Sequence, residues 1–113
     1  MLGFNHAFRG LFQMIRTERN FKIQLIVFFI VIGLGFILEI SSFDWLIVLL
    51  ISAMVLTLET INSAIEKTCD LITKEDNNQI KRIKDISAGA VLLVSIFAIV
   101  IGIIIFYPYL FSM

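Results

Sequence analysis

The stretch WLIVLLISAMVLTL (45–58) runs directly into ETINSAIEKTCD (59–70), and this junction decides the fold. The first stretch is apolar over 14 residues, which is about 21 Å of helix at 1.5 Å per residue. Because the hydrocarbon core of a bilayer is about 30 Å thick, a helix that crosses it must continue for about six more residues. The helix is therefore predicted to carry polar side chains at one edge of a membrane.

Four polar side chains of the second stretch fall on one face of this helix, and they are Glu59, Asn62, Glu66 and Asp70. Steps of three, four and four residues keep them within an arc of roughly 80°. A carboxylate near the bilayer core costs about 2.5–3.5 kcal/mol, so several that are aligned indicate a function. From the depth of the helix, we expect Glu59 and Asn62 inside the edge of the bilayer and Glu66 and Asp70 near the water.

The composition of the 113 residues is that of a membrane protein. The hydrophobic fraction is 59% and the mean hydropathy is +0.99, whereas about 45–50% apolar residues is usual in soluble domains. Nine basic and nine acidic residues balance, and without a basic patch interleaved with aromatics nucleic-acid binding is not expected. One cysteine, Cys69, excludes an intrachain disulfide, and one histidine, His6, excludes a histidine triad. Both are expected to be structural. The start of the sequence does not read as a cleavable secretory leader, so the apolar segments are expected to stay in the mature protein.

The whole chain, 1–113, is predicted to be one all-α integral membrane domain. Residues 1–19 place apolar side chains on one face and polar side chains on the other. This pattern is typical of a surface helix that lies in the membrane interface or packs on the protein's own membrane domain. Three apolar segments can cross the membrane, and the predicted spans are 21–38, 45–66 and 86–107.

The connections between the spans are polar. Residues 39–44 are predicted to form a short turn, residues 73–85 a charged connection, and Pro108 the end of the third span. Basic residues lie before the first span and between the second and third, but not in the 39–44 turn. The positive-inside rule therefore predicts a cytoplasmic N-terminus, a cytoplasmic 73–85 connection and a C-terminus outside. The polar face then lies at the cytoplasmic leaflet, where ATP is available.

The residue types on the polar face suggest chemistry on a lipid. Glu59 could act as a general base on a lipid hydroxyl, and Asn62 could orient the base or the hydroxyl. The structural alternative is that the Glu59 carboxylate is hydrogen-bonded by Asn62 or by a neighbouring helix, and that this contact specifies how the helices assemble. Trp45 stands where an interfacial aromatic belongs, and we predict lipid-substrate contacts for Glu59, Ser63 and Trp45.

Hard oxygen donors on the same leaflet suit Mg²⁺, and the candidates are Glu18, Glu66 and Asp70. The alternative for each is a salt bridge at the interface, with Arg19 and Lys67 as partners. Lys84 could meet a phosphate and Asp85 could cap the following helix at its N-terminus, and the spacing favours capping at least as much as a nucleotide contact. No soluble nucleotide-binding signature is found in the sequence.

Three segments resemble the prokaryotic diacylglycerol kinase family, which includes undecaprenol kinases. ETINSAIEKTCD (59–70) is similar to the family pattern E-x-x-N-[ST]-A-I-E-x-x-x-D. TERNFKI (17–23) and KDISAGAVLL (84–93) also resemble family blocks, and the three occur in the family's order.

The resemblance implies a homotrimeric bundle in a bacterial cell membrane that transfers the γ-phosphate of Mg-ATP to a lipid hydroxyl. It implies that Glu59 is the general base, with Asn62 in the same site, and that Glu18 and Glu66 are ligands of Mg²⁺. Sites shared between subunits are expected. The TERNFKI segment favours undecaprenol over diacylglycerol as the acceptor. The nucleotide-binding residues that the resemblance implies are Glu18, Glu66, Asp70, Glu75, Asp76, Asn77, Lys84 and Asp85.

Two other classes of function remain open from the residues alone. A small ion-coupled transporter or channel subunit could use Glu59 as a carrier of protons or cations. Such a pathway should be polar across the whole membrane, but 45–58 is apolar except for Ser52 and Thr57. An assembly protein that uses the polar face only to join helices would show no dependence on nucleotide.

Overall fold

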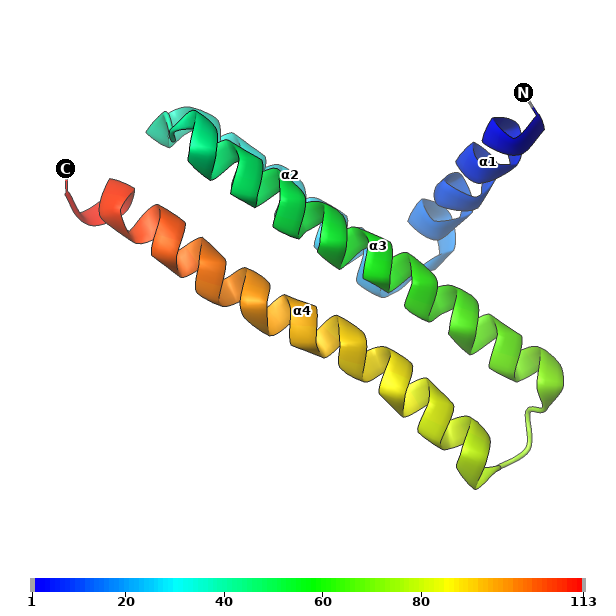
Figure 1. Ribbon diagram of the computed structural model, residues 1–113. Coiled ribbons are helices and arrows are strands. Elements are labelled where there is room, and N and C mark those ends of the chain that lie inside the picture. The colour runs from blue at the N-terminus through cyan, green and yellow to red at the C-terminus, as the bar shows by residue number, and fades with distance from the viewer. Residues whose placement is uncertain (1, 113) are drawn as a thin grey trace.

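The computed structural model describes residues 2–112, so Met1 and Met113 at the ends of the predicted domain lie outside the described residues. These described residues form four α-helices joined by short connections, in which α2, α3 and α4 run side by side and α1 projects away from them (Figure 1). Three of the helices are long and apolar enough to cross a membrane. This confirms the all-helical fold with three helices that are able to span a membrane. The helices are α1 (Leu2–Thr17), α2 (Arg19–Leu38), α3 (Ser42–Ile72) and α4 (Asn78–Phe111).

The turn between α2 and α3 is shorter than the predicted 39–44 segment, because both helices are capped by local hydrogen bonds. Glu39 ends α2 in the left-handed conformation, with φ of 53°. The Ile40 N–H then donates to the Gly35 carbonyl over 3.2 Å. Ser41 caps the start of α3, since its hydroxyl accepts from the Asp44 N–H at 3.1 Å. Helix α3 therefore begins three residues before the predicted span.

The predicted 73–85 connection is also mostly helical. The Asn77 side chain accepts hydrogen bonds from the Gln79 and Ile80 N–H groups, at 2.9 and 3.1 Å, and so starts α4 at Asn78. The prediction that Pro108 ends the last helix is wrong, because α4 continues to Phe111. Proline removes its own N–H from the helix and crowds the carbonyl four residues earlier, but the Pro108 carbonyl still accepts from the Ser112 N–H at 3.1 Å.

Tyr109 ties the end of α4 to the start of α3. Its hydroxyl donates to the Asp44 carboxylate over 2.7 Å and accepts from the Ser41 N–H at 3.0 Å. Beside it lies a buried apolar cluster of Ile40, Val48, Ile105 and Phe106. Side-chain packing and two hydrogen bonds therefore hold the last turn of α4 in place beyond the proline.

Tyr109→Phe is expected to destabilise the protein by about 1 kcal/mol, because it deletes both hydrogen bonds and keeps the ring. Thermal unfolding in detergent micelles measures the loss as a lower midpoint. Tyr107→Phe is the matched control, since Tyr107 is 59% exposed and should unfold at the wild-type temperature. Equal midpoints for the two variants would contradict the proposed role of Tyr109.

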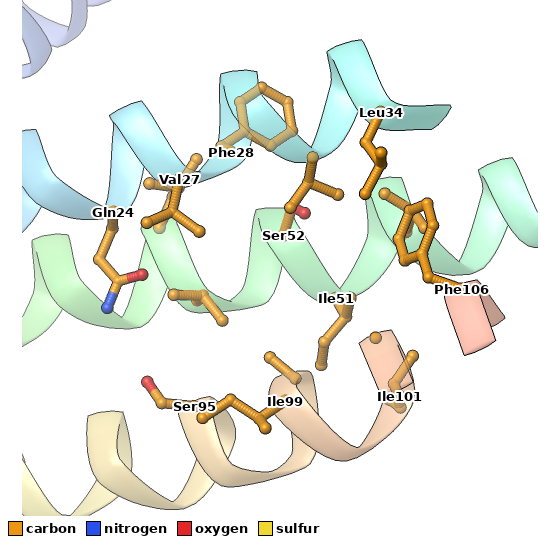
Figure 2. Close-up of a pocket in the computed structure, with 16 residues that line it drawn as sticks. Gln24, Val27, Phe28, Leu34, Ile51, Ser52, Ser95, Ile99, Ile101 and Phe106 are labelled. Carbon is orange, nitrogen blue, oxygen red and sulfur yellow. The ribbon is translucent and has the colours of Figure 1, made fainter. Parts of the chain in front are cut away.

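An apolar cavity of about 460 Å³ lies among α2, α3 and α4 (Figure 2). Its lining is aliphatic and aromatic apart from three polar side chains, one from each helix. These are Gln24 from α2, Ser52 from α3 and Ser95 from α4. The cavity lies within the three helices that can span a membrane, so it offers space for an apolar group.

Candidate functional site

A second, smaller cavity of about 130 Å³ is polar and lies where the junction of α1 and α2 meets α3. Glu18 stands between the two helices with extended backbone, and its side chain reaches α3. The cavity brings together three carboxylates, those of Glu18, Glu59 and Glu66. The other lining residues are Met14, Arg19, Asn20, Phe21, Asn62 and Ser63.

Burial decreases along the polar face of α3. Glu59 is 5% exposed and Asn62 is 8% exposed, whereas Glu66 is half-buried and Asp70 is exposed. Glu59, the base candidate, is thus the most buried of the four side chains within the protein, whereas the order predicted from the sequence concerns depth in the bilayer. The chain therefore presents a graded surface from a closed end at Glu59 to an open end at Asp70.

Glu18 is held by two partners from α3. The Ser63 hydroxyl donates a hydrogen bond to its carboxylate, and the Lys67 ammonium lies 3.1 Å from the same oxygen. The hydrogen bond from Ser63, followed by the interaction with Lys67, lowers the pKa of Glu18 below its ordinary value. Glu18 is therefore ionised at neutral pH. Of the two predicted salt-bridge partners, Lys67 makes this contact.

Asn62 lies at the centre of a hydrogen-bond chain. Its amide nitrogen donates to the Glu66 carboxylate over 3.4 Å, and its amide oxygen accepts from the Ser87 hydroxyl of α4 at 2.6 Å. The sequence marks Ser87 only as one of several small residues at the start of the third span. Ser87 is 25 positions from Asn62, and no helical spacing could have linked them.

The predicted nucleotide residues divide between two places. Glu18 and Glu66 line the polar cavity, whereas five others line a third cavity of about 620 Å³ around the α3–α4 connection. In that cavity the Lys84 ammonium pairs with the Asp70 carboxylate at 2.7 Å. Asp85 is exposed and does not line it. The five residues are Asp70, Glu75, Asp76, Asn77 and Lys84.

Trp45 lies away from the polar cavity. It is 14 residues before Glu59 on α3, which is about 21 Å along the helix. Its ring packs on Phe36, with centroids 4.9 Å apart, and over Gly35. Trp45 therefore supports the turn between α2 and α3, whereas the predicted lipid contacts Glu59 and Ser63 lie together in the cavity.

The donor set of the polar cavity suits a Mg²⁺–nucleotide complex. Among residues 2–112, no group of three or more Asp, Glu, His or Cys side chains could hold a metal ion alone. Mg²⁺ is usually bound by one or two carboxylates together with substrate phosphates. Glu18 and Glu66 share the cavity and are oxygen donors of this kind.

Comparisons with known proteins give matches over most of the chain. Residues 5–106 match the model of a family described as prokaryotic diacylglycerol kinase. An undecaprenol kinase of Bacillus subtilis is 40% identical over 105 residues, which cover 93% of this chain and 85% of that protein. A diacylglycerol kinase of Synechocystis sp. is 32% identical over 114 residues, which cover 100% of this chain and 65% of that protein.

Proposed function

This chain belongs to the prokaryotic diacylglycerol kinase family, and on that premise we propose that it uses Mg-ATP to phosphorylate a lipid alcohol at the cytoplasmic leaflet. The observation that carries the proposal is the polar cavity with its three carboxylates. The polar cavity lies one helical turn from the apolar cavity. Phe21 and Glu59 line the polar cavity, and Gln24 and Val55, one turn away on the same helices, line the apolar cavity. A lipid tail in the apolar cavity would bring its hydroxyl to Glu59.

Glu59 is the general base in this proposal. Its carboxylate takes the proton from the lipid hydroxyl as the hydroxyl oxygen forms a bond to the γ-phosphorus of ATP. The bond between the γ-phosphorus and the bridging oxygen breaks, and ADP leaves. Asn62 and Ser63 line the same cavity and orient the reacting groups. The products are the lipid phosphate, ADP and a protonated Glu59, which returns its proton to water.

Glu18 and Glu66 would hold Mg²⁺ together with the nucleotide phosphates. The bound metal would neutralise the charge of the phosphates. Lys84 would exchange its exposed partner Asp70 for a phosphate, which costs little because exposed ion pairs are weak. The α3–α4 connection, with Glu75, Asp76 and Asn77, together with the nearby Asp85, would contact the rest of the nucleotide.

The membrane arrangement that supports this activity is also a proposal. The distribution of basic residues favours a cytoplasmic N-terminus and a C-terminus outside a bacterial cell membrane. Helix α1 would lie in the interface, since its aromatic residues Phe4, Phe8 and Phe12 are exposed. We propose a homotrimer, as the resemblance of the three segments to the family implies. Glu18 and Glu59 meet within one chain, so a shared site would draw other residues from a neighbour.

The alternative of an ion-coupled transporter is not favoured. Both named relatives are kinases, and the α3 segment 45–58 offers no continuous polar path across the membrane. Undecaprenol is the favoured acceptor, because the relative at 40% identity is named an undecaprenol kinase and the one at 32% a diacylglycerol kinase.

Transfer of radiolabelled γ-phosphate tests the proposal, with undecaprenol and diacylglycerol compared in the same vesicles. We expect faster labelling of undecaprenol, complete loss of transfer when EDTA removes Mg²⁺, and full recovery when Mg²⁺ is added back. Faster labelling of diacylglycerol would overturn the choice of acceptor alone. Labelling of neither lipid would overturn the proposed function.

A further inference from the structure

We infer that Ser87 of α4 is a positioning residue that fixes the orientation of the Asn62 amide and, through it, of Glu66. The inference rests on the proposed function, because it assigns Ser87 to the same reaction. Ser87 does not line the polar cavity and acts only through Asn62. Both side chains are buried, with Ser87 9% and Asn62 8% exposed.

The chemistry of the three groups determines the direction of the hydrogen bonds. An ionised carboxylate only accepts hydrogen bonds, so the Asn62 group that faces Glu66 must be the amide nitrogen. The amide oxygen then faces Ser87, and the Ser87 hydroxyl must donate to it. The observed contacts have this arrangement, with 2.6 Å from Ser87 Oγ to Asn62 Oδ1 and 3.4 Å from Asn62 Nδ2 to Glu66 Oε1.

Removal of the Ser87 hydroxyl would delete the hydrogen bond that holds the Asn62 amide in this orientation. A buried amide oxygen without a donor is unfavourable, and the Asn62 amide would then rotate or find another partner. Rotation by half a turn would place the amide oxygen against the Glu66 carboxylate, acceptor against acceptor. Ser87 also lies one helical turn after Lys84, which pairs with Asp70 of α3. The start of α4 is therefore joined to the polar face of α3 at two successive turns.

Steady-state kinetics give the first test. Ser87→Ala is expected to lower kcat roughly tenfold, as loss of one buried hydrogen bond implies, with the KM for the lipid unchanged. Ser87→Thr keeps the hydroxyl and should retain most of the activity. Ser42→Ala is the matched control, because it makes the same change at an exposed position about 30 Å along α3 from Asn62 and should keep the wild-type kcat. Should Ser87→Ala fail to fold, Ser87→Cys keeps the shape with a weak donor and should also lose kcat.

The Asn62 side-chain amide gives a second test that needs no activity and no metal. The chain has five asparagines, so selective ¹⁵N labelling yields a simple spectrum in which loss of one signal in Asn62→Ala assigns residue 62. We expect Ser87→Ala to shift the Asn62 amide protons and to speed their exchange with water. Ser87→Thr and Ser42→Ala should leave this signal near its wild-type position.

The two tests separate failure of this inference from failure of the proposed function. An unchanged Asn62 signal in Ser87→Ala, or a kcat within twofold of wild type, would overturn the role of Ser87 while phosphate transfer stands. A wild-type protein that transfers no phosphate to either lipid would overturn the proposed function, and the role of Ser87 in catalysis with it.

Discussion

Glu59→Gln is expected to reduce phosphate transfer by a factor of about 10²–10⁴, which is the usual contribution of a general base. Glutamine has nearly the shape of glutamate, but its amide does not accept a proton at neutral pH. Glu59 is 5% exposed and lines the cavity that also holds Glu18 and Glu66. Loss of one of three neighbouring carboxylates also reduces their mutual repulsion, so the variant should fold as well as the wild type.

The measurement is labelled phosphate transfer to undecaprenol, made beside thermal unfolding of the same preparation. Glu39→Gln is the matched control, because Glu39 is exposed in the turn between α2 and α3 and should transfer phosphate at the wild-type rate. If Glu59→Gln kept more than a tenth of wild-type activity, Glu59 could not be the general base. The expected result is a variant that transfers phosphate about 10²–10⁴ times more slowly and has an unchanged unfolding midpoint.

Gly35→Ala is expected to lower the free energy of unfolding by about 1–3 kcal/mol relative to Gly33→Ala, as overpacking of a close contact usually does. Gly35 is buried near the end of α2. A Cβ atom there would lie 2.7 Å from Cη2 and 2.9 Å from Cζ2 of Trp45, and 3.2 Å from Cδ1 of Ile40. The indole ring is stiff and also packs on Phe36, so it cannot yield without disturbing the turn.

Gly33→Ala is a close control, because a Cβ at Gly33 has no neighbour within 4 Å. Both variants gain the same helix propensity of about 1 kcal/mol from replacing glycine with alanine, and the difference between them isolates the packing of Trp45. Thermal unfolding in one detergent gives the two midpoints. Equal midpoints would show that the indole ring moves freely, against the packing described for the turn.

These two predictions concern opposite parts of the molecule. The Gly35–Trp45 contact supports the turn between α2 and α3, about 21 Å along α3 from Glu59. Gly35→Ala should therefore keep its activity per folded molecule, whereas Glu59→Gln should keep its stability. The same pair of assays on both variants separates the residues that hold the helices together from those that carry the reaction.

The sequence predicted the fold well, because its signals are local. Apolar runs long enough for a bilayer identified the three spans, and steps of three and four residues placed Glu59 and Asn62 on one face. The helix ends were predicted less well. Side-chain caps at Ser41 and Asn77 extend α3 and α4 beyond their apolar runs. A hydropathy pattern does not reveal such caps, because it reports only how apolar each segment is.

The candidate site was predicted only in part. The positions of Glu59, Asn62 and Glu66 follow from helical periodicity within α3, and their common cavity agrees with it. Ser87 could not be linked to Asn62, and the packing of Trp45 on Phe36 and Gly35 could not be foreseen, while the lipid contact of Trp45 stays a prediction. Each of these depends on which helices pack against each other and in which register.

The sequence by itself therefore determined three membrane-length helices, the polar face of one of them and, through its motifs, the family. Only the tertiary structure decided that Glu18, between α1 and α2, contacts Ser63 and Lys67 of α3. It also decided that Ser87 of α4 donates a hydrogen bond to Asn62 of α3. Periodicity and hydropathy act within one helix and are read along the chain. A contact between helices depends on the rotation and sliding of whole elements, which the packing of many side chains sets together.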